Sequence, residues 1–189
     1  LYEDGSLQRS CATFPTLATE FFIALGLDKV FPKSNLFGKY LMTDWNYDDT
    51  REVDVIMGAF MLVRASLIPK IGMMDEAFFM YSEEVDWCYR FKAAGSKVYF
   101  YPDVTCVHLW GGSSKAVKVE SLLRLYKARV QFFRKHYGRV SAFLYKIILE
   151  FNALIRVGPG ALYYLTRSNP ASQQKHYAFR QLMLAIPGF

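Results

Sequence analysis

The last third of the chain constrains its fold most strongly, because the sequence from Val117 to the C-terminus is patterned for helices and is strongly basic. Residues 114–189 carry 13 Lys and Arg against 2 Asp and Glu, a net charge of +11, whereas residues 1–113 carry 10 against 15, a net charge of −5. This asymmetry predicts an acidic working region followed by a basic surface for an anionic partner. Nucleic acid and anionic lipid are the two candidate partners.

The apolar part of this tail raises the question of a membrane helix. Residues 139–167, RVSAFLYKIILEFNALIRVGPGALYYLTR, are interrupted by Lys146, Glu150 and Arg156 and broken by a Gly-Pro-Gly sequence. No run of about 18 uncharged apolar residues exists, so a spanning helix is disfavoured. Two alternatives stay open, a helix lying in the plane of the lipid headgroups and a helix packed on the globular part. The tail contains no known nucleic-acid-binding module, so we expect no nucleic-acid partner.

The composition predicts a folded protein in a reducing compartment. Hydrophobic residues make up 52% of the 189 residues, which is enough for one domain with a core. Three cysteines lie far apart and outside CxxC spacing, which argues against a disulfide framework and a structural zinc site and favours the cytoplasm. The chain begins at Leu1 without a signal-peptide pattern, so we expect it to be a piece of a longer protein.

The first 114 residues are patterned for an α/β fold with mixed helices and strands. Gly58 and Ala59 lie inside an expected buried strand, and glycine there indicates a bulge or the close approach of a ligand. Ser82 is placed to cap a helix that Gly95 ends. The expected elements are a helix over 16–31, a buried strand over 53–64, a short helix within 65–78 that stops at Gly72, a helix over 83–94, and strands within 97–102 and 104–110.

Three acids lie within four residues at the start of the helix expected over 83–94. On a helical wheel Glu83 and Asp86 share a face with Arg90, which can offset both carboxylates. Glu84 stands apart on the apolar arc, where a carboxylate needs a partner or a task. Burial raises the pKa of such a group, whereas the first helical turn favours the anion, and an ionised, partly dry carboxylate suits a general base for an alcohol. The alternative is an ordinary acid in the first turn of a helix.

His108 is the second candidate for a functional residue. It lies near the end of VTCVHLW, just before Trp110 and a glycine-serine loop. A lone histidine on a strand is usually a packed core residue, but at a strand end it can ligate a divalent metal. The backbone N–H groups of Gly111 and Gly112 can bind phosphate oxygens.

These segments together resemble the C-terminal half of the catalytic domain of family 2 inverting glycosyltransferases, especially the rhamnosyltransferase-like branch. The resemblance covers roughly residues 3–114, from DGSLQRSCATFP to VDVIMGAFMLVR, GMMDEAF, FMYSEEVDWCYRFKAAG and VTCVHLWGGSS. It implies a partial GT-A fold that lacks its N-terminal nucleotide-binding half, a nucleotide-diphosphate sugar donor and a divalent metal, Mg or Mn. The family's Asp-x-Asp metal motif lies upstream of this region and is absent here, so we expect the chain alone to transfer no sugar.

The resemblance also implies roles for single residues. Glu84 matches the catalytic base, with glutamate in place of the usual aspartate, and Glu83 and Asp86 match its acidic neighbours, of which Asp86 orients Arg90 or the acceptor. His108 matches a metal ligand. The acceptor and diphosphate contacts correspond to Gly58, Ala59, Arg90, Trp110, Gly111, Gly112 and Ser113.

The sequence therefore predicts an acceptor-side half of a glycosyltransferase domain over 1–114 and a basic amphipathic tail over 115–189 that associates with a membrane. The expected function is transfer of a sugar, with rhamnose as the candidate, to a glycan or a polyprenyl-diphosphate-linked acceptor in the synthesis of cell-surface polysaccharide. The expected location is the cytoplasm, on the inner face of the cell membrane. The alternative is a non-catalytic module that binds membranes or carbohydrate.

Overall fold

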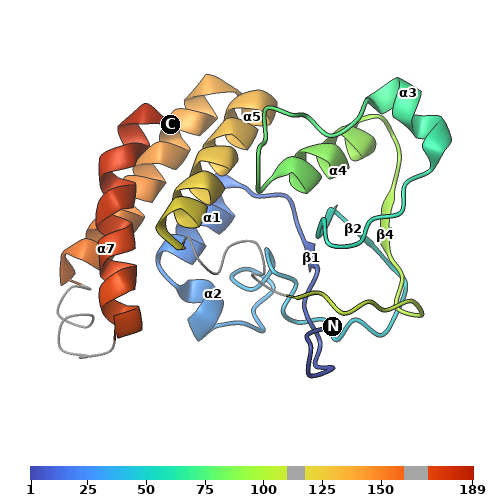
Figure 1. Cartoon of the computed structure of the whole chain (residues 1–189), viewed down its shortest axis with the longest axis horizontal. Coiled ribbons are helices and arrows are strands. Elements are labelled where there is room, and N and C mark those ends of the chain that lie inside the picture. Colours follow the sequence, from blue (N-terminus) through green and yellow to red (C-terminus); the bar gives the residue numbers. More distant parts are fainter. Residues whose placement is uncertain (110–117, 160–169) are drawn as a thin grey trace.

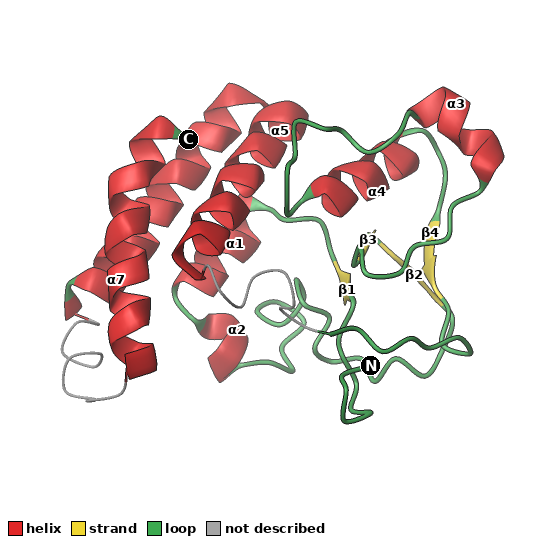
Figure 2. Ribbon diagram, in the orientation of Figure 1, coloured by secondary structure: helices red, strands yellow, loops and turns green. Residues whose placement is uncertain are grey.

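The computed structural model describes residues 1–109, 118–159 and 170–189 and combines helices with short strands (Figures 1 and 2). The helices α1, α5 and α7 pack together at one end of the molecule, and the strands lie at the other end with α3 and α4. In chain order the elements are β1 (Cys11–Ala12), α1 (Leu17–Ala24), α2 (Leu27–Val30), β2 (Arg51–Val53), β3 (Val55–Ile56), a 3₁₀ helix (Ala65–Leu67), α3 (Ile68–Ile71), α4 (Glu83–Ala93), β4 (Val98–Phe100), α5 (Lys118–Val157), α7 (Pro170–Ala185) and a closing 3₁₀ helix (Ile186–Gly188).

The described strands form two antiparallel pairs. In the first, β1 pairs with β3 so that Cys11 lies opposite Ile56. In the second, β2 pairs with β4 so that Val53 lies opposite Val98. Helix α4 contacts β3 and β4. It buries Val85, Cys88 and Phe91, whose spacing of three residues places them on one face of a helix. The mixed α/β character expected from the sequence is confirmed at this level.

Two of the expected strands are wrong. The run 53–64 is a strand only as far as Ile56, and the remainder lies at the surface, where Leu62 is 91% exposed. Asp54 separates β2 from β3, and its carboxylate accepts a hydrogen bond from the backbone N–H of Phe14 and forms an ion pair with Lys92. Residues 104–109 also form no strand, and Val104 and Val107 are exposed. In both segments the apolar run has no neighbouring strand within the described ranges that could satisfy its backbone groups.

The helix boundaries agree with local sequence signals, such as glycines and capping residues, more closely than the strand boundaries do. The expected helix over 16–31 divides into α1 and α2 at Gly26, which has a φ of +72°. Helix α1 begins with a reciprocal capping arrangement between Thr16 and Thr19. Helix α3 stops at Gly72 and α4 is followed by Gly95, both with positive φ, as the sequence predicts.

The tail packs on the rest of the protein along one face. Its buried side chains belong to the same core as Val53, Phe78 and Val98, so packing is confirmed for that face. None of the helices in the described ranges combines the length and the apolar character that a membrane crossing requires. The tail residues buried in this core include Phe132, Phe133, Tyr145, Leu149 and Leu182.

Helix α5 bends at Gly138, which has φ +87° and ψ 174°. These dihedrals lie in a region that only glycine adopts readily, so the bend depends on this residue.

We expect Gly138→Ala to lower the free energy of unfolding by about 1–3 kcal/mol, because a side chain at this φ strains the backbone although nothing lies within 4 Å of its Cβ position. Urea unfolding at 25 °C measures the change. The control is Gly188→Ala, where the added Cβ also meets nothing and no positive φ is imposed. Equal stability of the two variants would contradict this account of the bend.

Candidate active site

The start of α4 carries unusual backbone geometry. Tyr81 and Ser82 have φ values of 71° and 65°, and positive φ is uncommon for residues other than glycine. Such strain concentrates at functional sites, where the surrounding structure holds it in place. Ser82 stands at the capping position, as expected, but its side chain makes no capping hydrogen bond. The capping role predicted for its hydroxyl is therefore wrong, because the left-handed backbone turns the side chain away from the helix end.

Three successive residues at this turn hold polar atoms without hydrogen-bond partners. They are Ser82 Oγ, Glu83 Oε2 and Glu84 Oε2, each buried, and no described residue supplies a partner. Buried polar atoms are nearly always hydrogen-bonded in folded proteins, so three unsatisfied atoms on one turn require a reason. A ligand that donates hydrogen bonds to the carboxylates would provide one.

Burial changes the acidity of Glu84. It raises the pKa of Glu84 above the ordinary value for glutamate, and the negative charge of Glu83 raises it further. Backbone N–H groups of Glu84 and Val85 and the charge of Arg129 act in the opposite sense without reversing the shift. A carboxylate with a raised pKa is a stronger proton acceptor when it is ionised. Glu84 remains partly exposed as a residue, so a substrate can reach it.

The turn at Gly58 lies directly over Glu84. A Cβ built on Gly58 would meet Glu84 Cβ at 3.7 Å, and Gly58 and Ala59 are themselves exposed. The structure therefore brings together Gly58 and Glu84, which the sequence analysis placed in one site. This contact places the turn beside the first turn of α4, although the strand setting of Gly58 was not predicted correctly.

Arg129 of α5 lies near Glu84. The sequence did not predict the cluster that Arg129 forms with Glu20 and Tyr40. Its Nη1 donates to Glu20 Oε1 at 3.0 Å and to the Tyr40 hydroxyl at 2.7 Å. Burial raises the pKa of Glu20, while the Arg129 charge lowers it. The available signal was a single carboxylate in the apolar helix LATEFFIA, since an acid on such a helix needs a cation from elsewhere.

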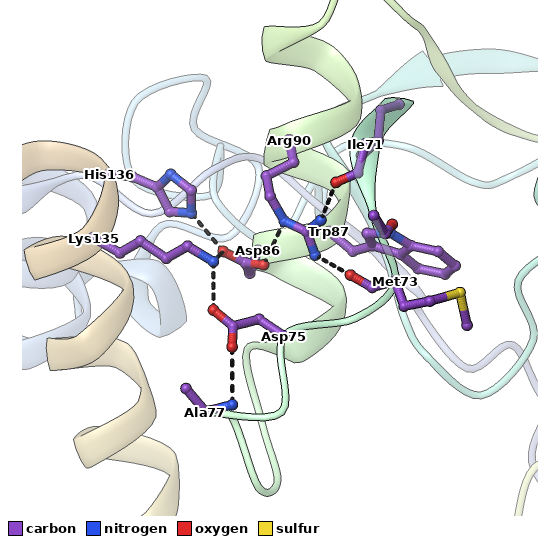
Figure 3. Close-up of polar contacts among 10 residues, drawn as sticks. Ile71, Met73, Asp75, Ala77, Asp86, Trp87, Arg90, Lys135 and His136 are labelled. Atoms are coloured by element: carbon purple, nitrogen blue, oxygen red, sulfur yellow. Dashed lines mark hydrogen bonds and ion pairs between the residues drawn. The ribbon is translucent and has the colours of Figure 1, made fainter. Parts of the chain in front are cut away.

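Asp86 forms the polar centre that fixes α4 to its neighbours (Figure 3). Its carboxylate is fully buried and lies 2.8 Å from Arg90 Nε, 2.6 Å from Lys135 Nζ and 2.7 Å from His136 Nε2. Lys135 also pairs with Asp75 at 2.7 Å. Asp86 thus joins α4 to α5, and through Lys135 both are tied to the loop before α4.

Arg90 extends this centre to the segment after α3. Its Nη1 and Nη2 donate to the backbone oxygens of Ile71 and Met73, each at 2.7 Å (Figure 3). Within the described ranges Arg90 forms no ion pair with Glu83, so the expected shared pairing is wrong for that residue. Glu83 therefore keeps a buried oxygen without a partner beside Glu84.

Burial and hydrogen bonding act in opposite directions on the pKa values of Asp86 and His136. Burial would raise the pKa of Asp86, but hydrogen bonds from Lys135, His136 and Arg90 outweigh it and hold the pKa below its usual range. Burial lowers the pKa of His136 despite the neighbouring carboxylate. An ionised carboxylate can only accept hydrogen bonds. In a neutral His136 the Nε2 atom therefore carries the hydrogen and donates a hydrogen bond to Asp86.

His108 contacts Gln8 near the N-terminus. Its Nδ1 lies 2.8 Å from Gln8 Oε1, and its backbone N–H donates to the oxygen of Leu1. Across residues 1–109, 118–159 and 170–189 no three His, Cys, Asp or Glu side chains gather in a group that could hold a metal. The described residues therefore do not form a metal site by themselves. The expected diphosphate segment, Trp110, Gly111, Gly112 and Ser113, lies outside the described residues.

The chain is similar to two curated glycosyltransferases. It is 33% identical over 102 residues to the rhamnosyltransferase WbbL of Escherichia coli (strain K12), a match that covers 52% of this chain and 34% of WbbL. It is 42% identical over 40 residues to the low-salt glycan biosynthesis hexosyltransferase Agl10 of Haloferax volcanii, covering 21% of this chain and 13% of Agl10. The chain thus spans about a third of the length of WbbL. No family model matches, and no solved structure is similar.

We expect Asp86→Asn to destabilise the protein by about 3 kcal/mol, the lower part of the range for breaking a buried ion pair, since Arg90 and Lys135 keep some access to water. Arg90, Lys135 and His136 all donate to this carboxylate. The NH₂ group of an asparagine would face at least one of these donors and could not accept its hydrogen bond. Urea unfolding at pH 7 measures the loss. Asp44→Asn, an exposed acid without a described ion pair, is the control and should stay within about 0.5 kcal/mol of wild type. A loss for Asp86→Asn as small as that of the control would remove Asp86 from this central role.

Proposed function

We propose that this chain forms the acceptor side of an inverting glycosyltransferase in which Glu84 is the general base. The observation that carries the proposal is Glu84 itself, a partly exposed residue beside Gly58 that has a raised pKa and holds a buried oxygen without a partner among the described residues. Similarity to WbbL and Agl10 supports a glycosyltransferase role in general. Assignment to family 2 and to the GT-A fold is part of the proposal.

In the proposed reaction an acceptor hydroxyl gives its proton to the carboxylate of Glu84. The acceptor oxygen forms a bond to the anomeric carbon of the donor while the bond from that carbon to the nucleotide diphosphate breaks. The diphosphate leaves with the bonding electrons, and attack from the opposite face inverts the configuration. Glu84 holds the proton after transfer and releases it to water.

The neighbouring residues support this step in distinct ways. The negative charge of Glu83 raises the pKa of Glu84 and so strengthens it as a base. Arg129 provides a positive charge that favours the ionised form before transfer. Asp86, through Arg90, Lys135 and His136, holds α4 in place and is a positioning residue. The strained turn at Tyr81 and Ser82 presents both glutamates at the start of the helix.

We further propose a nucleotide-diphosphate sugar as donor, with rhamnose as the candidate sugar, and a glycan or a polyprenyl-diphosphate-linked acceptor for cell-surface polysaccharide. The cytoplasmic face of the cell membrane is the proposed location. A divalent metal, Mg or Mn, would neutralise charge on the diphosphate when bound. His108 is its proposed ligand in this chain and its other ligands would lie outside the described residues, so no step above depends on it.

Glu84→Gln in the full-length protein should lower kcat by about 100-fold or more while donor binding changes little, because loss of a general base typically costs this much. Sugar transfer from nucleotide-diphosphate donors measures kcat, and calorimetry measures donor binding. Glu83→Gln in the same turn is the matched comparison and should lower kcat far less, because it weakens the base without removing it. Retention of more than a tenth of the activity by Glu84→Gln would refute the base assignment. Donor binding without any transfer by the wild type would favour a non-catalytic module.

The pH dependence gives a separate test. Glu84 must be ionised to accept a proton, so kcat/KM should fall as the pH drops through its pKa, with a midpoint above the ordinary glutamate value of about 4.3. Glu83→Gln removes the charge that raises this pKa and should move the midpoint to lower pH. An unmoved midpoint in Glu83→Gln would show that the titrating group is not Glu84.

A further inference from the structure

The bend of α5 encloses a pocket that the proposed reaction does not use. Its volume is about 420 Å³, and it is lined from both sides of Gly138, with Phe189 closing one wall. The bend and the C-terminus lie together in Figure 1. Val130, Ala142 and Phe143 contribute apolar surface to this pocket. The pocket therefore depends on the same glycine that bends the helix.

Four cations line this pocket, and none has a counterion among the described residues. They are Lys127, Arg134, Arg139 and Lys146, two from each side of the bend. No described Asp or Glu lies within ion-pair distance of any of them, whereas Arg124, Arg129 and Lys135 on the same helix are all paired. Four unpaired cations around an apolar floor fit a ligand that carries phosphate charge next to hydrocarbon.

An exposed apolar stripe continues from the pocket along the second half of α5. Apart from the adjacent pair Phe143 and Leu144, successive members are three or four residues apart, so they lie on one face of the helix. Phe143 belongs to both the pocket and the stripe, which makes them one continuous surface. The opposite face of the same helix is buried through Tyr145 and Leu149. The stripe consists of Val140, Phe143, Leu144, Ile147, Phe151 and Leu154, all between 40% and 72% exposed.

Charge decides between the candidate occupants of this surface. In a two-fold symmetric dimer the same patch faces itself, so the four cations of one copy would meet the four of the other. Nucleic acid would satisfy the cations but leave the apolar stripe without a role. The surface of an anionic bilayer supplies both groups, since lipid phosphates can enter the pocket while the stripe contacts the acyl chains below the headgroups.

We propose that the bend pocket and the apolar stripe of α5 together form a docking surface for an anionic phospholipid bilayer, with a lipid headgroup phosphate bound between Arg134 and Arg139. In this arrangement α5 lies in the plane of the membrane. Its buried face holds the globular part above the headgroups, and its stripe enters the boundary of the acyl chains. The site at Glu84 is built from other residues, so this inference stands whether or not the chain transfers sugar.

Vesicle flotation tests the docking surface with the whole protein. Wild type should bind vesicles of phosphatidylcholine with 30 mol% phosphatidylglycerol more tightly than pure phosphatidylcholine, and the binding should weaken with added salt. Arg134→Gln combined with Arg139→Gln should lower the partition coefficient on anionic vesicles roughly 30-fold, from about 1 kcal/mol for each basic residue near an anionic surface. The control is Arg64→Gln with Lys70→Gln, two exposed cations outside the tail.

The apolar stripe has its own matched pair of variants. Phe143→Ser with Ile147→Ser should lower binding to both kinds of vesicle, whereas Leu184→Ser with Val30→Ser, at residues at least as exposed, should leave it unchanged. Circular dichroism and urea unfolding confirm that each variant is folded. Equal vesicle binding by stripe and control variants would overturn the proposal. Absence of wild-type binding to anionic vesicles would also overturn it. So would a sedimentation experiment in which the wild type is a dimer and the Phe143→Ser, Ile147→Ser variant is a monomer.

Discussion

The buried carboxylate of Asp86 is the interaction on which the rest of the structure depends. It is fully inaccessible to water and is bound by Arg90, Lys135 and His136, which come from two helices (Figure 3). A buried charge is tolerated only when it is paired and hydrogen-bonded, so these partners are required once Asp86 is buried. Arg90 also binds the backbone at the end of α3, and Lys135 also pairs with Asp75. This group fixes α4 relative to α5, together with the packing of Tyr89 against Phe132.

Asp86 and Glu84 lie within one turn of α4, but the first has a structural role and the second has the proposed functional role. Asp86 has three cationic or hydrogen-bonding partners and a lowered pKa, and these partners account for all of its properties. Glu84 has a raised pKa and a buried oxygen without a partner in the described part of the chain. An acid that is satisfied by its neighbours stabilises the fold, whereas one left unsatisfied at a reachable position is available for chemistry. The same rigid helix carries both, so the anchored residue positions the available one.

Helix α5 serves two surfaces at once. Its buried face joins the core of the strands and α4 and supplies Arg129, Lys135 and His136 to the region of the acids. Its other face carries the apolar stripe, and the pocket at the bend is lined by four cations that have no counterion among the described residues. The sequence left packing and membrane contact as alternatives for this tail. The structure establishes packing for one face, and within the described part of the chain the side chains of the opposite face stay partly exposed.

Local signals in the sequence were sufficient to place α4, its stop at Gly95, the division of charge between the two parts, and the position of Glu84 away from Asp86 and Arg90 on the helix. These features depend on residues three or four apart or on a single glycine, which is why sequence alone determined them. Only the tertiary structure decided how far the strands extend and that Ser82 does not cap α4. It also decided which residues pair with Asp86, and it brought Arg129 to Glu20 and Tyr40. A strand needs a neighbouring strand and a buried charge needs a counterion, and both come from segments up to about a hundred residues away in the chain.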